Sequence, residues 1–254
     1  MNLAQKAIVI LKSGGGGQTP DEAYADIVLG YSPTIYYKLN EASGTTAINY
    51  GSLSSADGTY SASDIAGQTT GPFGGLAPLF VSTTKDLVNI YSSALSGDFD
   101  LTDATIFYWF RCDASYAESH SDRFLQLLAD ASNYLATYRS GTGFRVELRG
   151  TGNTTLVVLT TTSFEDAGWH LMLITNDVTG GTLTIYVDNV SVGTGVARPW
   201  GASSLASTDA VLAANDSVTP AAANSVDGSM AHFGYCSTLL DGTARTALYN
   251  GGPV

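Results

Sequence analysis

The residues best spaced for chemistry are the charged ones of the segment FRVELR, residues 144–149. Arg145, Glu147 and Arg149 alternate with apolar residues, and alternate residues of a strand point to the same face. Such a charged triplet could line a catalytic cleft. The three apolar residues between the charges instead favour an ordinary half-buried strand whose charged side chains form solvated ion pairs.

The other carboxylates and histidines form no catalytic pattern. Glycosidases that carry paired carboxylates on one strand space them as Glu-x-Asp-x-x-Glu, and none of the five glutamates begins that pattern. The histidines at positions 120, 170 and 232 are isolated from one another and from cysteine, which excludes zinc-ligand spacing. His232 alternates with Ala231 and Phe233 and is interpreted as structural. With no Gly-x-Ser-x-Gly elbow and no phosphate loop, we predict a protein that is not an enzyme and has no catalytic residue.

Two kinds of ligand stay open. Oxygen-only calcium sites leave faint sequence traces, and loop residues that could contribute to one are Asp130, Asp209, Asn215 and Asp216. We assign no metal ligand and expect no cofactor, with calcium left as the alternative. Sugar binding would need an exposed aromatic ring that stacks on a pyranose face. Trp200, which follows Arg198 and Pro199 in a predicted loop, is the candidate glycan contact.

Composition excludes several partners. The 23 acidic and 11 basic side chains give a net charge of −12, which repels nucleic acid and anionic lipid. Because of this charge, we expect no nucleic acid partner. The apolar run at residues 7–11 is too short for a signal-peptide core or a membrane span, so we also expect no membrane insertion. Cys112 and Cys236 are interpreted as buried thiols, although a single bridge between neighbouring strands would be allowed.

The elements that must position these residues are mostly strands. Period-two alternation and Gly, Ser, Asn and Asp punctuation predict strands at residues 34–39, 105–111, 123–129, 134–138, 144–149, 154–160 and 228–236. Residues 168–193 predict two adjacent strands, with turns at Gly180-Gly181 and Asp188-Asn189. A capping box of Thr19 and Glu22 begins a short helix over residues 19–30, and Asp241 begins another that ends before Gly251. Residues 50–100 and 197–225 predict long loops with short strands.

Residues 1–18 are predicted to form a flexible arm with a glycine-rich hinge. Four consecutive glycines, Gly14 to Gly17, cannot support a core and let the preceding residues reach a partner. The apolar residues predicted to anchor this arm are Ala7, Ile8, Val9, Ile10 and Leu11.

Four blocks in order give the chain a family resemblance. They are IYYKLNEASGTTAINYGS with ADGTY after it, TIFYWFR, GWHLMLITND with LTIYVDNVSVGTG, and VDGSMAHFGYCSTLLDGTARTALYNGG. Together they resemble the laminin-G-like domains of the concanavalin A-like lectin and glucanase superfamily, as found in phage structural proteins. The resemblance implies an all-β, two-sheet antiparallel jelly-roll sandwich over residues 19–254, with short N- and C-terminal helices. Asn189 departs from the Gly usual there, at little cost.

The resemblance also allows an enzyme on this fold to be tested. FRVELR is similar to the Arg-x-Glu-Leu-Arg strand of alginate lyases. Those enzymes also carry a Gln-x-His strand and a Tyr-x-Lys strand near the C-terminus, and this chain has neither. The lyase interpretation is therefore disfavoured.

These observations lead us to expect a non-enzymatic virion structural protein, a phage capsid decoration protein displayed on the virion surface. Its partners would be other virion structural proteins, capsid subunits first, and a homo-oligomer and a glycan are further partners that we keep open. The alternative is a carbohydrate-binding or adhesin module of a tail, fibre or cell surface. Fold alone does not decide between them.

Deleting residues 1–18 should leave a soluble, folded β domain that no longer assembles with its partner subunits. The reason is that burying the five apolar arm residues would contribute about several kcal/mol to attachment, and AIVIL suits a strand added to a neighbour's sheet edge. Quantitative gels of purified particles measure incorporation. Normal incorporation of the truncated protein would move the anchor to the sandwich surface.

Overall fold

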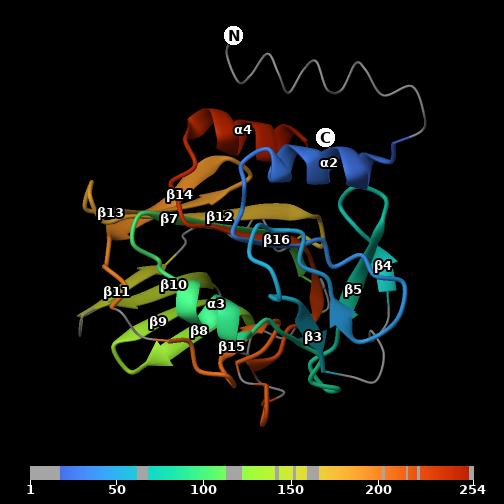
Figure 1. The fold of residues 1–254 in the computed structure, drawn as a ribbon, viewed down its shortest axis with the longest axis horizontal. Coiled ribbons are helices and arrows are strands. Elements are labelled where there is room, and N and C mark those ends of the chain that lie inside the picture. The colour runs from blue at the N-terminus through green and yellow to red at the C-terminus, as the bar shows by residue number, and fades with distance from the viewer. Residues whose placement is uncertain are drawn as a thin grey trace.

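The computed structural model is a two-layered β-sandwich with its two terminal helices on one side (Figure 1). It describes residues 18–61, 68–112, 122–140, 143–150, 153–158, 166–201, 204–215, 217–221 and 224–251. Of the predicted arm at residues 1–18, residues 1–17 lie outside the described residues, so its hinge and its anchor residues stay predictions. No helix in the described ranges is long and apolar enough to span a membrane.

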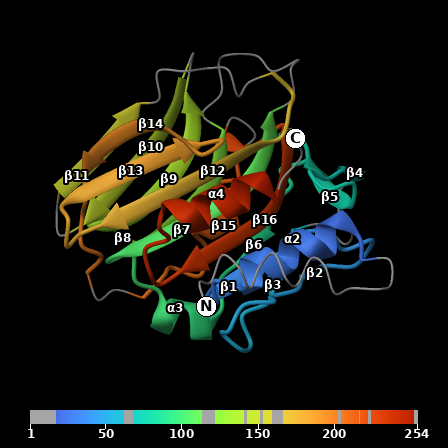
Figure 2. The same ribbon diagram turned by 90° about the horizontal axis from the view of Figure 1, so that it is seen from above.

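All strand pairs of the first sheet are antiparallel, and β1 joins the sheet by pairing with β16. In spatial order its strands are β14 (Val190–Val196), β13 (Thr182–Val187), β12 (His170–Asp177), β7 (Ala104–Cys112), β16 (Gly228–Cys236), β5 (Leu76–Phe80) and β4 (Gln68–Thr70), with β1 (Ile35–Tyr37) beside β16. The helices α2 (Pro20–Leu29) and α4 (Gly242–Asn250) cover its outer face (Figures 1 and 2).

The second sheet is also antiparallel and packs its inner face on the first. In spatial order its strands are β11 (Asn153–Val158), β10 (Gly143–Gly150), β9 (Asn133–Ser140), β8 (Arg123–Asp130), β15 (Ala210–Leu212), β6 (Val88–Asn89), β3 (Gly58–Tyr60) and β2 (Thr46–Ala47). The short helix α3 (Ser93–Asp98), which the sequence analysis did not anticipate, lies beside the sandwich. The predicted all-β jelly-roll with two terminal helices is confirmed.

Both terminal helices begin and end where the sequence predicted. The Thr19 hydroxyl accepts from the Glu22 amide at 3.3 Å, and the Glu22 carboxylate accepts from the Thr19 amide at 2.8 Å. Asp241 caps α4 by accepting from the amide of Ala244 at 2.8 Å. These caps satisfy amides that have no partner inside their helix.

Strand β7 is covered on both faces, as its continuous apolar sequence predicted. Ile106, Tyr108 and Phe110 point into the core between the sheets, whereas Phe107 and Trp109 pack under the helices. The Trp109 ring nitrogen donates to the Tyr24 hydroxyl of α2 at 2.9 Å. The strand therefore belongs to two cores at once.

The hairpins after β12 and β13 follow the predicted turns. Asp188 and Asn189 have φ values of 51° and 63°, the pair of positive φ angles that a type I′ turn requires. Gly181, with φ of 77°, supplies the positive φ in the turn before. Asn189 therefore fills its position without glycine, as expected.

The two cysteines lie at opposite ends of one strand pair. In the β7–β16 register Cys112 is opposite Gly228 and Cys236 is opposite Thr105. Both are buried, and this antiparallel register keeps the two thiols from forming a bridge with each other.

Strand β16 contains a β-bulge that changes which side chains face the helices. Ala231 is opposite Trp109 and Gly234 is opposite Phe107, so β16 has one more residue than β7 between these pairs. His232, with φ of 51°, therefore points to the same side as Ala231, while Phe233 enters the main core. The predicted strict alternation at His232 is wrong because of this extra residue.

Gly234→Ala should lower the free energy of unfolding by about 1–3 kcal/mol, because a Cβ there would lie 2.2 Å from the Phe107 ring in a full core. Gly97→Ala in α3 is the matched control, since a Cβ there meets no atom within 4 Å. Urea unfolding of both variants measures the difference. Equal stability of the two would show that the Phe107 ring can move aside without cost.

Candidate functional site

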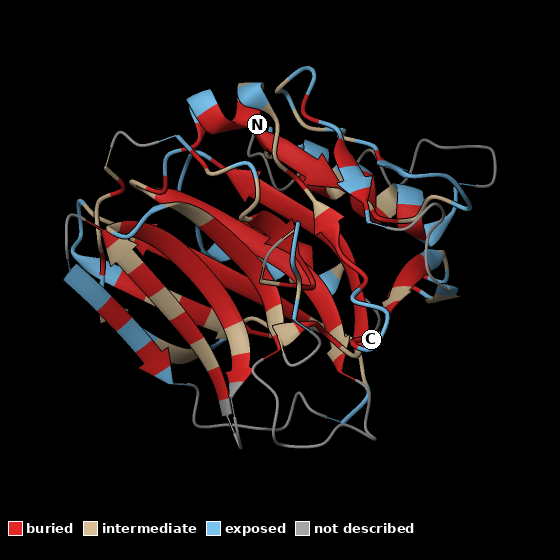
Figure 3. Cartoon of the chain, turned by 90° about the horizontal axis from the view of Figure 1, so that it is seen from below, coloured by how far each residue is buried: buried red, intermediate tan, exposed pale blue. Residues whose placement is uncertain are grey.

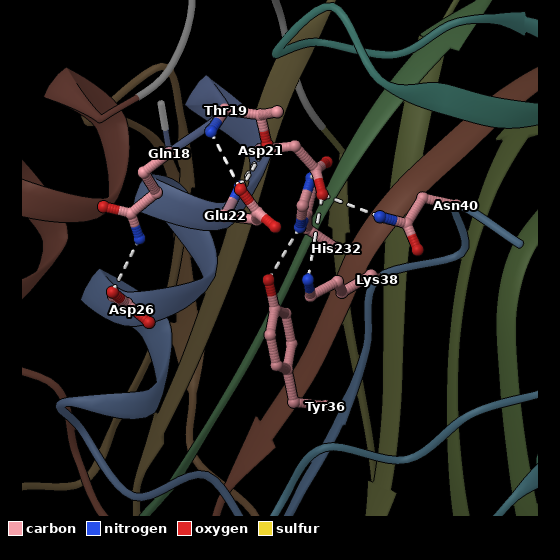
Figure 4. A network of polar contacts seen from close by, with 9 residues as sticks. All are labelled: Gln18, Thr19, Asp21, Glu22, Asp26, Tyr36, Lys38, Asn40 and His232. Atoms are coloured by element: carbon pink, nitrogen blue, oxygen red, sulfur yellow. Dashed lines mark hydrogen bonds and ion pairs between the residues drawn. The ribbon is translucent and has the colours of Figure 1, made fainter. Parts of the chain in front are cut away.

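A buried polar network joins α2 to the first sheet (Figure 4). His232 Nδ1 lies 2.7 Å from the Tyr36 hydroxyl, and His232 Nε2 lies 3.0 Å from Asp21 Oδ1. The other carboxylate oxygen of Asp21 accepts from Asn40 Nδ2 at 2.7 Å and lies 3.9 Å from Lys38 Nζ. The bulge in β16 aims His232 at the helix, and the capping box places Asp21 in the first helical turn.

The protonation states of this network follow from its surroundings. Burial lowers the pKa of His232, so the neutral ring accepts from Tyr36 and donates to Asp21. Burial alone would raise the pKa of Asp21, but hydrogen bonds from His232 and Asn40 and the charge of Lys38 lower it. The result is an ionised carboxylate with a partner for each oxygen.

This Tyr-His-Asp chain is not arranged for nucleophilic catalysis. Tyr36 and His232 are 0% and 1% exposed, so no substrate atom can reach the tyrosine hydroxyl. An open pocket of about 480 Å³ lies beside the network and is lined by Thr19, Pro20, Asp21, Glu22, Lys38, Asn40, Phe73, Gly74, Gly75 and Leu76. The network itself fastens α2 to the sheet, as the structural interpretation of His232 predicted.

His170 joins the start of β12 to the next hairpin. Its Nδ1 lies 2.7 Å from Asp188 Oδ2 and its Nε2 lies 3.0 Å from Asp166 Oδ1. Burial opposes the charged ring, but these two carboxylates prevail and raise the pKa of His170. His120 lies outside the described residues.

A second polar surface, which we call the Arg–Tyr face, lies on the outer side of the second sheet. It consists of Arg123 and Gln126 on β8, Tyr134 and Tyr138 on β9, and Arg145, Glu147 and Arg149 on β10. Pairing places Arg145 opposite Tyr138 and Tyr138 opposite Arg123, so the three form one row across the sheet. In the adjacent part of β10, Arg149 is opposite Tyr134.

The arginines of this face are held against aromatic rings. The Arg123 guanidinium carbon lies 5.3 Å from the centre of the Tyr138 ring and 5.8 Å from that of Tyr134. The Arg149 guanidinium carbon lies 5.3 Å from the centre of the Tyr134 ring. Cation–π contacts of this kind orient the planar guanidinium groups.

Hydrogen bonds fix the remaining groups of the face. Glu147 Oε1 accepts from Arg149 Nε at 3.0 Å and from Nη2 at 2.7 Å, and the Tyr138 hydroxyl donates to Glu147 Oε2 at 3.3 Å. Arg123 donates to Gln126 Oε1 at 2.8 Å and to the Tyr134 hydroxyl. Gln126 in turn donates to Asp209 at 2.8 Å. The charged groups are therefore ordered before any ligand arrives.

No helix of the described chain covers this surface. Seen from below in Figure 3, buried and intermediate residues alternate along the strands of the second sheet, and an exposed strand borders them. The border is β11, where Leu156 and Val158 are 48% and 49% exposed opposite Glu147 and Arg145. The predicted half-buried strand at FRVELR is confirmed, because Phe144, Val146 and Leu148 lie in the core.

Trp200 is not the exposed ring that sugar stacking would need, so that prediction is wrong. The side chain is 7% exposed and packs edge-on against Phe99, with ring centres 5.2 Å apart. The segment after β14 folds back over the sandwich, and Gly201 donates to Asn133 at 2.7 Å. Trp200 therefore closes one end of the core.

The described loop residues considered for calcium make hydrogen bonds within the protein. Asp209 uses its two carboxylate oxygens on Gln126 and Thr208, and the carbonyl of Asn215 also accepts from Gln126. Asp130 instead orders its own turn by accepting from Ser132 at 2.7 Å, and Asp216 lies outside the described residues. Within the described ranges no group of three His, Cys, Asp or Glu side chains could hold a metal ion.

Sequence reasoning found the arginines of β10 but not their partners. Tyr134 and Tyr138 were noted only as part of a strand, and Asp21 only as part of a helix. The available signal was the alternation in YLATY, which puts both tyrosines on one face. Their contact with the arginines depends on strand pairing, which a single strand's pattern does not reveal.

Comparison with known proteins supports the fold. A model of the concanavalin A-like lectin/glucanases superfamily matches residues 83–240. No curated protein matches the sequence. Domain 4 of AbnA, a GH43 extracellular arabinanase from Geobacillus stearothermophilus solved with arabinotriose, superposes with a TM-score of 0.61 at 12% identity, covering 86% of this chain and 98% of that one.

Two toxin structures share the same architecture. A structure of botulinum neurotoxin type C, whose cell entry is described as dependent upon interaction with two ganglioside molecules, has a TM-score of 0.60 at 12% identity, covering 86% of this chain and 51% of that one. The binding domain of Paraclostridial Mosquitocidal Protein 1 has a TM-score of 0.53 at 10% identity, covering 73% of this chain and 45% of that one. The chain spans about half the length of these toxin chains, and the likeness is one of fold.

Asp21→Asn should lower the free energy of unfolding by about 1–3 kcal/mol at pH 7, since it removes a buried hydrogen-bonded charge. The difference from wild type should shrink on acidification. Asp21 and His232 both have lowered pKa values, so their contribution is present above the unfolded values, about 4 and 6.5, and is lost as pH falls through the folded ones. The raised pKa of His170 acts oppositely: its contribution is present below about 6.5 and is lost as pH rises through the folded value.

Denaturant unfolding between pH 3 and pH 8 measures these effects. Asp26→Asn, on the exposed side of the same helix, is the control and should change stability by less than about 0.5 kcal/mol. A constant difference between wild type and Asp21→Asn at every pH would contradict the assigned protonation states.

Proposed function

We propose that this chain, which belongs to the concanavalin A-like lectin/glucanases superfamily, is a non-catalytic glycan-binding domain. Two solved structures of similar fold support this class of function. One is the arabinanase domain solved with arabinotriose, and the other is the neurotoxin whose entry depends upon gangliosides. At 12% identity neither transfers its ligand to this chain, whose own surface must supply the binding groups.

The observation that carries the proposal is the Arg–Tyr face. Helices close the outer side of the first sheet, but the described helices leave this face of the second sheet open. It combines one partly exposed aromatic ring, that of Tyr138, with fixed hydrogen-bond donors and acceptors, whereas Tyr134 is only 7% exposed. Sugar sites need both, because a ring packs against the apolar side of a pyranose while polar groups bind its hydroxyls.

Tyr138 is the central residue of this face. Its ring is partly exposed and lies between Arg145 and Arg123 in the row across the sheet. Its hydroxyl is already bonded to Glu147, so the ring is held in place and little side-chain entropy is lost on binding. A sugar beside Tyr138 would lie near the guanidinium groups of Arg123 and Arg145, although the face of the Tyr138 ring that Arg123 covers would not be available to it.

The proposal of a non-catalytic role follows from how the carboxylates are used. Hydrolysis of a glycosidic bond needs two carboxyl groups, one of which must give a proton to the leaving oxygen. On this face Glu147 accepts three hydrogen bonds from Arg149 and Tyr138, and Asp209 accepts from Gln126 and Thr208. Such engaged carboxylates suit ligand positioning better than proton transfer.

The capsid decoration role expected from the sequence gains no support from the family match or the structures named above, none of which is described as a virion protein. Its location on a virion surface and its capsid partners remain a proposal of lower rank. Of the features that favoured it, the apolar arm lies outside the described residues, and the fold is shared with the binding domains named above. A glycan-binding domain would serve a tail, a fibre or a cell surface equally well.

Tyr138→Ala should weaken glycan binding by about 1 kcal/mol while leaving the fold intact, since it removes one stacking ring from the face. The measurement is affinity electrophoresis and calorimetry on a panel of arabinan, xylan, β-glucan and polygalacturonate. Tyr186→Ala is the matched control, because Tyr186 also lies under an arginine, Arg245, but on the helix-covered sheet.

The same panel tests the absence of catalysis. We expect no release of reducing or unsaturated ends by wild type, and therefore none for Glu147→Ala to abolish. Wild-type turnover of any panel member would overturn the non-catalytic assignment. Failure to bind every member would return the protein to a structural role.

A further inference from the structure

We propose that the glycan bound by the Arg–Tyr face is an acidic one, whose sugar units carry carboxylate groups. This inference rests on the proposed function and names its ligand class. It starts from a contrast in charge: the chain has 23 acidic and 11 basic side chains, yet the central rows of this face carry three arginines and one glutamate. In a protein with net charge −12, such a cationic surface needs a reason.

The three arginines are not equivalent. Arg149 is neutralised by Glu147, with both hydrogen bonds to one carboxylate oxygen. Among the described residues, no carboxylate lies within 4.0 Å of the guanidinium of Arg123 or Arg145. Arg123 donates to an amide oxygen and to a tyrosine hydroxyl, and Arg145 contacts the hydroxyl of Tyr138. These two groups therefore keep their charge for a ligand.

Their hydrogen-bonding capacity is also only partly used. The Nε atoms of Arg123 and Arg145 are buried and meet no acceptor in the part of the chain that the structure describes. A guanidinium presents five donors in a planar fork that matches the two oxygens of a carboxylate. The buried Nε atoms are out of reach of a ligand, and Arg245 has one as well, so an incoming carboxylate would accept from the Nη atoms of Arg123 and Arg145.

The placement of the two arginines favours a polymer over a small acid. Arg145 on β10 and Arg123 on β8 are separated by β9, so their backbones lie roughly 10 Å apart. Both side chains reach toward Tyr138 on the strand between them, so a ligand that lies across the three strands can contact both groups. A chain of acidic sugars lying across the strands would offer a carboxylate to each arginine and a pyranose face to Tyr138 between them.

The rest of the molecule confines such a ligand to this face. The surrounding negative surface repels a polyanion, and salt screens that repulsion beyond about 10 Å at 0.1 M. Binding should therefore depend on the local arginine contacts and weaken as sodium chloride increases, because contacts between partly exposed charges are screened too.

The test compares full-length wild type on polygalacturonate, on its methyl ester, on neutral arabinan and on dextran sulfate. We expect binding to polygalacturonate, loss of binding on esterification, and an affinity reduced roughly ten-fold by Arg145→Gln or Arg123→Gln. Arg145→Lys should recover only part of the loss, because it keeps the charge but not the fork. Arg245→Gln is the matched control: it removes the same charge from a similar tyrosine stack, 4.0 Å from the Tyr186 ring, on the other side of the molecule.

The outcomes separate this inference from the function on which it rests. If arabinan or the methyl ester binds as tightly as polygalacturonate, the proposal of an acidic ligand is overturned, but the glycan-binding role is kept. Equal binding to dextran sulfate, or equal loss in Arg245→Gln, would reduce the interaction to unspecific charge attraction and also overturn it. No binding to any of the four polymers would overturn both proposals. Circular dichroism of each variant establishes that it is folded.

Discussion

The constraint on which the structure depends is that β7 and β16, at the centre of the first sheet, are buried on both faces. A strand whose side chains are apolar on both sides must be covered twice. The second sheet supplies one cover, and α2 with α4 supplies the other. Fully burying each large apolar side chain contributes roughly 1.5–3 kcal/mol, so neither cover can be removed without exposing half of the strand pair.

This double cover decides where the molecule can bind anything. The helices occupy the outer face of the first sheet and hold it through Trp109, Tyr24 and the Asp21–His232 pair. The second sheet has its inner face in the core, and the described helices leave its outer face open. The polar side chains available to a flat ligand are therefore those of β8 to β11, and this is where the arginines and tyrosines gather.

Local signals in the sequence predicted the elements that local chemistry determines. Thr19 and Glu22 identified α2 because a capping box involves only residues three positions apart, and Asp188-Asn189 identified its turn because both residues tolerate positive φ. The alternation of FRVELR likewise predicted which side chains face the core. None of these inferences required knowledge of a distant contact.

The failures share a cause, which is dependence on residues far away in the chain. The bulge at His232 arises between strands more than a hundred residues apart, so alternation within β16 could not reveal that His232 lies on the same side as Ala231. Trp200 looked like a loop residue because its neighbours are Arg198 and Pro199, and only Phe99 shows that it belongs to the core. The Arg–Tyr face could not be assembled either, since it requires the register of β8, β9 and β10 together.

The same pair of residue types does different work on the two sides of this sandwich. Arg245 of α4 lies 4.0 Å from the ring of Tyr186, where the pair links a helix to the sheet beneath it. Arg123 makes similar contacts with Tyr138 and Tyr134, but no helix of the described chain lies above them. A cation–π contact between elements stabilises packing, whereas one within an open face fixes the direction in which a charge points. The two arginine–tyrosine pairs differ in whether a helix lies over them and not in their residue types. The position of the helices is in turn set by the apolar strands at the centre of the fold, which need a second cover.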